Sequence, residues 1–171
     1  PSTALVRSGG AGGVLRSRRN LDGGGVRSGR GASVTVDPGQ SIELRGAGNI
    51  TVEGRLTARG GSILLDDVRD ALQTYQATGS GLQYRIGKDA VLDVSADSHV
   101  ERDASGRRQG ILRDGGSIGI GGTLDWEDRD DLGNRPPDAF VVIERGAVLD
   151  ASGATAVLDV QGQGETTLAS N

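Results

Sequence analysis

A two-strand unit that repeats along the chain is the strongest constraint on its fold. The clearest copy covers residues 140–153, FVVIERGAVLDASG, and reads as a short strand, a turn at Arg145-Gly146 and a second short strand. Apolar residues are spaced by two on both sides of this turn, from Val141 to Leu149. Alternation over four to eight residues is typical of a half-buried strand.

Similar units occur at residues 34–46, 50–60, 86–96 and 118–126. The turns of the five units are Pro38-Gly39, Glu53-Gly54, Lys88-Asp89, Gly121-Gly122 and Arg145-Gly146. The step between matched apolar residues across a turn is even, as from Val36 to Ile42, so the same face of the chain stays buried. Glycine suits such turns because it reaches backbone angles that are costly for other residues.

Two short strings occur twice in the sequence. AVLD at Ala90–Asp93 returns at Ala147–Asp150, 57 residues later, and GGSI at Gly60–Ile63 returns at Gly115–Ile118, 55 residues later. The 171 residues include 30 Gly, but only one Trp, two Tyr and one Phe. A stack of repeats can fill a narrow interior with aliphatic side chains and use glycine at its corners. The sequence therefore predicts an all-β solenoid of stacked parallel strands.

We expect residues 34–65 and 84–168 to form these strands, with alternate apolar side chains pointing inward. The expected inward-pointing residues are Ile42, Leu44, Ile50, Val52, Leu56, Ile86, Leu92, Val94, Ile118, Ile120, Leu124, Val141, Ile143 and Leu149. Leu149→Asp is accordingly expected to unfold or aggregate the chain, because a buried unpaired carboxylate costs several kcal/mol.

Polar segments interrupt the repeats and define the expected organisation. Residues 1–33 are a Gly/Arg-rich irregular segment or a first repeat, residues 34–168 form the β-helical part, and residues 169–171 are the truncated end of a longer chain. The expected insertions are residues 66–83, 97–113 and 127–138. The first has apolar residues at helical spacing after a cap at Asp66 or Asp67. The second is expected to be a hairpin around Ala104-Ser105-Gly106.

Charge and composition exclude several classes of function. The net charge of −4, from 19 basic and 23 acidic residues, lacks the basic excess expected of a nucleic-acid-binding protein. The absence of Cys excludes disulfides and thiol chemistry. No apolar run approaches the roughly 18 residues of a membrane span.

Candidate catalytic and metal-binding residues favour structural interpretations. The acidic run Glu127, Asp128, Asp130, Asp131 offers oxygen ligands for Ca²⁺, but it does not have the spacing of a known calcium loop. His99 is the only His, which argues against zinc. The aspartates considered for polysaccharide cleavage are Asp66, Asp67 and Asp70 with Arg69, or Asp93 with Asp150. Because Asp93 and Asp150 lie at equivalent repeat positions, we interpret them as structural. The prediction is no enzyme, no metal and no cofactor.

Four strings carry a family resemblance: GRLTARGGSILL at 54–65, IGKDAVLDVSA at 86–96, GGSIGIGG at 115–122 and IERGAVLDASG at 143–153. They resemble the filamentous-haemagglutinin-like large exoproteins of Gram-negative bacteria, which are exported by two-partner secretion. The resemblance implies a right-handed parallel β-helix, an outer-membrane transporter as partner during secretion, and a secreted or cell-surface location. It implies adhesive or scaffold work and carries no catalytic residues.

The predicted function is a structural and adhesive segment that binds a surface or matrix glycan or protein and contributes to cell adhesion and biofilm. A toxin-delivery scaffold and a β-helical polysaccharide lyase or hydrolase remain the alternatives. Aromatic and charged residues on loops over a rigid scaffold are where recognition usually concentrates. The predicted contact residues are Tyr75, His99, Arg107, Arg108, Trp126, Asp128, Asp130 and Asp131.

Overall fold

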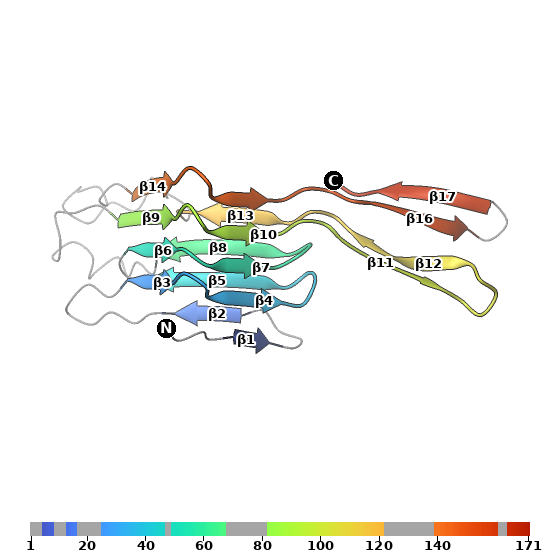
Figure 1. Cartoon of the computed structure of the whole chain (residues 1–171), viewed down its shortest axis with the longest axis horizontal. Coiled ribbons are helices and arrows are strands. Elements are labelled where there is room, and N and C mark those ends of the chain that lie inside the picture. Colours follow the sequence, from blue (N-terminus) through green and yellow to red (C-terminus); the bar gives the residue numbers. More distant parts are fainter. Residues whose placement is uncertain are drawn as a thin grey trace, which may run out of the picture.

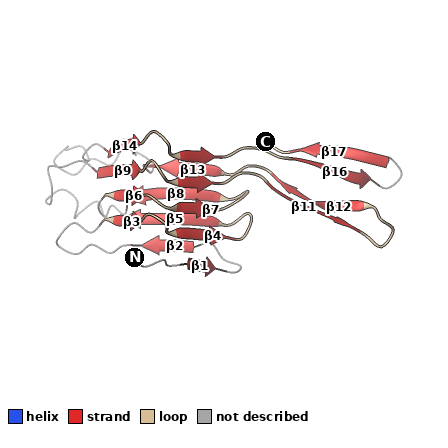
Figure 2. Cartoon of the chain, viewed as in Figure 1, coloured by secondary structure: helices blue, strands red, loops and turns tan. Residues whose placement is uncertain are grey.

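The computed structural model describes residues 5–8, 13–16, 25–46, 49–67, 82–121, 139–160 and 164–171. Every regular element in these ranges is a β-strand, and the strands form five sheets. Three parallel sheets surround one core and form the body of the structure, and two antiparallel hairpins project from one end of it (Figures 1 and 2).

The three parallel sheets share one pattern of construction. Sheet A contains, in spatial order, β1 (Leu5–Ser8), β4 (Ser33–Val36), β7 (Arg55–Thr57), β10 (Val91–Asp93) and β15 (Val148–Asp150). Sheet B contains β13 (Ser117–Ile120), β8 (Ser62–Asp67), β5 (Ser41–Gly46) and β2 (Gly13–Arg16). Sheet C contains β14 (Ala139–Ile143), β9 (Leu82–Ile86), β6 (Ile50–Val52) and β3 (Val26–Ser28). Within the body the chain visits A, B and C in turn, so successive strands of the body lie in different sheets, and each passage through the three sheets is here called a layer.

Four of the five expected turn pairs are corners between these sheets, and the fifth, Gly121-Gly122, lies partly outside the described residues. Pro38-Gly39 connects β4 of sheet A to β5 of sheet B, and Arg145-Gly146 connects β14 of sheet C to β15 of sheet A. Gly39 and Gly146 have φ angles of 81° and 107°, in the left-handed region that favours glycine. At Gly146 a Cβ would also lie 2.8 Å from the carbonyl oxygen of Lys88 in the layer beneath.

The repeated strings set the register between layers. Val91, Leu92 and Asp93 of β10 pair with Val148, Leu149 and Asp150 of β15, the same letters of the two AVLD copies. Ser62 and Ile63 of the first GGSI string likewise pair with Ser117 and Ile118 of the second. The two strings also bring Gly61 and Gly116 into contact, because a Cβ on Gly116 would lie 1.8 Å from the Gly61 carbonyl oxygen. The prediction that these strings are equivalent repeats is confirmed.

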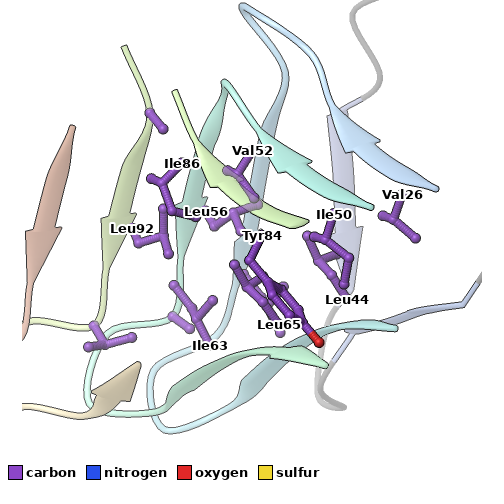
Figure 3. Packing of buried hydrophobic residues seen from close by; sticks show 14 of the residues in the cluster. Val26, Leu44, Ile50, Val52, Leu56, Ile63, Leu65, Tyr84, Ile86 and Leu92 are labelled. Carbon is purple, nitrogen blue, oxygen red and sulfur yellow. The ribbon is translucent and has the colours of Figure 1, made fainter. Parts of the chain in front are cut away.

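One aliphatic core lies between the three sheets. Leu56 and Leu92 reach it from sheet A, Ile63 and Leu65 from sheet B, and Ile86 from sheet C, and all five are fully buried. Figure 3 shows these side chains pointing toward one another, with the ring of Tyr84 among them. The expected alternation is visible in β5, where Ile42 and Leu44 are buried and Ser41 and Glu43 are not.

The prediction of a right-handed parallel β-helix over residues 34–168 is wrong. The described strands form five short sheets that are mostly parallel, and β11–β12 and β16–β17 pair antiparallel, so no single solenoid runs through residues 34–168. Residues 155–168, expected to begin another parallel repeat, instead form β16 (Thr155–Val160) and β17 (Gly164–Ala169). A period of two is common to both kinds of sheet, and the short connection at 161–163 suits antiparallel pairing rather than a parallel crossover.

The predicted core is correct except near its C-terminal end. Ile42, Leu44, Ile50, Val52, Leu56, Ile86, Leu92 and Val94 are buried, and Ile118 and Ile120 pack partly buried against them. Leu124 lies outside the described residues. By contrast, Val141, Ile143 and Leu149 are 49%, 51% and 37% exposed. In the described chain β14 and β15 are the last strands of their sheets, so the side chains of these three residues are covered on one side only. The expectation that Leu149→Asp unfolds the chain assumed a fully buried Leu149 and therefore no longer holds.

The three expected insertions have different outcomes. Residues 97–113 form the expected hairpin, with β11 (Asp97–Arg102) paired to β12 (Arg108–Arg113). A helix cap at Asp66 or Asp67 is wrong, because β8 continues through Asp67. The rest of that expected helix and all of residues 127–138 lie outside the described residues.

Candidate functional site: a two-hairpin arm

Hairpins β11–β12 and β16–β17 together form the most prominent projection of the described chain, here named the arm (residues 97–113 and 155–169). Both leave the same end of the three-sheet body (Figure 1). Strand β16 contacts β11 and β12, so the two hairpins support each other.

A local hydrogen-bond network closes the tip of the first hairpin. The Asp103 carboxylate accepts hydrogen bonds from the backbone N–H groups of Ser105 at 2.8 Å and Arg107 at 2.9 Å, and from Arg107 Nε at 2.8 Å. Hydrogen bonding from Arg107 lowers the pKa of Asp103. Gly106 has a φ of 78°, and Arg102 Nη1 donates to its carbonyl oxygen at 2.8 Å. The tip is therefore an ordered turn.

Arg108 and Asp159 join the two hairpins. The Asp159 carboxylate accepts from the Arg108 backbone N–H at 2.6 Å and from Arg108 Nη2 at 3.0 Å. These hydrogen bonds lower the pKa of Asp159. Both side chains are 27% exposed, so the ion pair is partly shielded from water. Asp159 is absent from the predicted contact residues, because no local pattern relates two residues that are 51 positions apart.

The base of the arm rests on the body. The Arg113 side chain lies over the corners of two layers, since a Cβ on Gly39 would be 3.2 Å from Arg113 Nη1 and one on Gly60 would be 3.1 Å from Arg113 Cβ. The backbone N–H of Gly115 donates to the Asn171 carbonyl oxygen at 2.6 Å, which ties the end of the second hairpin to the connection after the first.

The arm exposes apolar side chains on more than one surface. Ile111 is 59% exposed, Leu168 43% and Val100 42%. Ile111 is directly opposite His99 on the first hairpin, whereas Val100 is opposite Gly110, one residue along and therefore on the other face. His99 Nε2 lies 2.6 Å from Glu101 Oε1, and both side chains are well exposed.

The structure places three of the predicted contact residues on the arm. His99 is available at the surface, whereas Arg107 and Arg108 each already pair with a carboxylate of the arm, Asp103 and Asp159. Tyr75, Trp126, Asp128, Asp130 and Asp131 lie outside the described residues. Ile111, Val100 and Leu168 were not predicted as contacts; the only signal in the sequence was an apolar residue inside a polar insertion.

Asp93 and Asp150, one of the two sets of aspartates considered for catalysis, have structural partners, whereas Arg69 and Asp70 of the other set lie outside the described residues. Asp93 accepts from the backbone N–H and hydroxyl of Ser95 at 3.1 and 2.6 Å, and Asp150 accepts from the Ser152 backbone N–H at 3.0 Å. The hydroxyl and backbone of Ser152 lower the pKa of Asp150. The two residues pair in register and repeat the same turn, which confirms that they are equivalent positions of the repeat.

Two further ion pairs join neighbouring layers. Arg27 Nη2 lies 2.7 Å from Glu53 Oε2, and Arg85 Nε lies 2.9 Å from Glu144 Oε1. These hydrogen bonds lower the pKa of Glu53 and of Glu144. Among the residues that the structure describes, no group of three His, Asp or Glu side chains is arranged to hold a metal ion.

Comparison with known proteins found no matching family model, curated sequence or solved structure. In the described part of the chain, no helix has the length and apolar character needed to cross a membrane.

Proposed function

We propose that this chain is a structural display module of a secreted or surface-exposed exoprotein, and that its arm binds a partner protein. The observation that carries the proposal is the arm itself: two hairpins locked by Arg108 and Asp159 that present exposed Ile111, Val100 and Leu168 away from the body. Isolated hairpins are marginally stable in water, so mutual support gives this projection a defined shape.

The body supports a display role through its construction. In-register parallel layers, close glycine contacts and a single aliphatic core make a stiff support of the kind on which recognition loops are commonly carried. Outer strand edges and exposed apolar side chains on the arm suit a polypeptide partner, which can add a strand and cover the apolar residues. The resemblance to filamentous-haemagglutinin-like exoproteins supports export through an outer-membrane transporter and adhesive work at the cell surface.

The test is binding of the labelled chain to bacterial and host cells, before and after protease treatment of the cell surface. Ile111→Lys is expected to reduce binding strongly, because a charge replaces the most exposed of the large apolar side chains on the arm. Thr51→Lys, on the outer face of sheet C, is the matched control and is expected to bind like the wild type.

Three outcomes would replace the proposal. Binding that survives protease treatment but is lost after glycosidase treatment would make the ligand a glycan. Equal binding by Ile111→Lys and the wild type would move the contact away from the arm. Cleavage of a polysaccharide that is lost in Asp93→Asn or Asp150→Asn would replace adhesion with catalysis.

A further inference from the structure

One edge of the body exposes apolar side chains that continue the core. Strand β14 is the outermost strand of sheet C, and its inward-facing residues Val141 and Ile143 are 49% and 51% exposed. Val141 and Ile143 pair in register with Tyr84 and Ile86, which are 1% and 0% exposed. The exposure therefore reflects a missing covering layer and not an outward orientation.

The layers of sheet C show which kind of strand fits this edge. Two kinds of layer alternate at the corner that follows each strand: Gly29 and Gly87 in the first and third layers, and Glu53 and Glu144 in the second and fourth. The glycine of one layer makes room for the glutamate beneath it, since a Cβ on Gly87 would lie 3.1 Å from Glu53 Cγ. A layer added above Glu144 should therefore have a glycine at the corner that follows its sheet C strand.

The opposite edge of the same molecule has such a layer. Strand β3 is the outermost strand of sheet C at that edge and leads into Gly29. Within the described part of the chain, a Cβ built on Gly29 would meet nothing within 4 Å, so no described side chain fills the space beside Gly29 that Glu53 fills beside Gly87. Glu144 at one edge and Gly29 at the other are thus complementary halves of a contact already present once inside the body.

We propose that a second copy of this chain docks head to tail, with its β3 strand on the β14 edge. Val26 of the second copy would continue the column of Val141, Ser28 that of Ile143, and Gly29 would lie beside Glu144. Sheet B would extend in the same way, with β2 of the second copy on β13. Because the two edges differ, this contact is heterologous and can propagate into a chain of molecules.

In sheet A, docking requires that β15 of one molecule replace β1 of the next molecule. Sheet A has five described strands, whereas sheets B and C have four each. On docking, β15 of the first copy and β1 of the second copy would therefore compete for the same position in sheet A. β15 therefore takes the place of that β1 on β4, with Leu149 beside Val34 in the position that Val6 holds within one molecule. In this arrangement β1 competes with assembly and limits it.

The experiment is sedimentation velocity of the 171-residue chain over a wide range of concentration. The wild type is expected to associate as concentration rises, and a variant lacking residues 1–8 is expected to associate at lower concentration. Ile143→Lys blocks the β14 edge and Gly29→Glu places a carboxylate against Glu144 of the neighbour, so each variant alone should stay monomeric. Their equimolar mixture should form dimers and nothing larger, because each variant keeps one competent edge.

Controls separate this contact from other kinds of association. Ile111→Lys on the arm should associate like the wild type, so the result is independent of the proposed binding function. Circular dichroism verifies folding, and Val141→Lys replaces Ile143→Lys if the latter unfolds. Three results would each overturn the proposal. The wild type and the variant lacking residues 1–8 could both stay monomeric, Gly29→Glu could associate as strongly as the wild type, or the mixture could form no dimers.

Discussion

Leu92 and Leu149 show how position in the stack decides what a residue contributes. They are equivalent letters of the AVLD repeat and pair in register, yet Leu92 is fully buried and Leu149 is 37% exposed. Truncating a buried leucine to alanine typically costs about 2–5 kcal/mol, because apolar contacts are lost and a cavity remains.

We therefore expect Leu92→Ala to lower the free energy of unfolding by about 2–5 kcal/mol and Leu149→Ala to lower it by much less. Urea denaturation followed by circular dichroism measures both values in the same host. Equal losses in the two variants would mean that the layer above Leu149 is covered in solution, as it would be in an assembled state, and repetition at low concentration tests that explanation.

Among the elements, the arm depends most on a single contact. Arg108 and Asp159 connect two hairpins that otherwise touch mainly along β12 and β16. Asp159→Asn keeps the shape of the side chain but removes its charge, and it weakens the hydrogen bonds from the Arg108 backbone and guanidinium.

We expect Asp159→Asn to increase amide hydrogen exchange in β11, β12, β16 and β17 and to leave exchange in β5 and β8 unchanged. The physical reason is that only the arm relies on this pair, while the body is held by its core. Asp103→Asn is the matched comparison, because it should loosen the tip of the first hairpin without releasing β16. Faster exchange throughout the body would contradict the division between arm and body.

For the whole molecule, pH acts through carboxylates that are spread over the body and the arm. Hydrogen bonding lowers the pKa of Glu53, Asp103, Glu144, Asp150 and Asp159 below their ordinary values. A carboxyl whose pKa is lower in the folded state binds protons more readily when unfolded. Its contribution to stability is present above its unfolded pKa of about 4 and is lost as pH falls through the folded value.

We therefore expect the melting temperature to change little with these groups from neutral pH to about pH 5 and to fall below about pH 4. Thermal melts followed by circular dichroism measure this profile. Glu144→Gln, which cannot titrate, should lower the melting temperature at neutral pH and show a smaller loss on acidification than the wild type. A melting temperature that rises as pH falls through this window would show that the cross-layer pairs do not stabilise the fold.

The sequence by itself determined the local features of this protein. Even spacing of apolar residues identified the strands and most of the core, because side chains in a strand alternate between two faces regardless of what pairs with it. The AVLD and GGSI strings predicted which residues lie above one another, and Gly39 and Gly146 marked corners that need positive φ. The hairpin at 97–113 was also readable, from its polar residues and the central Gly106.

Only the tertiary structure decided the direction of pairing and the ends of the stack. A period of two is the same in parallel and antiparallel sheets, so residues 155–168 could not be assigned to a hairpin from their pattern. The position of a residue within the repeat likewise does not show whether another layer covers it. Leu149 was expected in the core because it matches Leu92, although no described strand lies above it. The link between Arg108 and Asp159 exists because folding brings together two hairpins that are distant in sequence, and such a contact leaves no periodic signal in the chain.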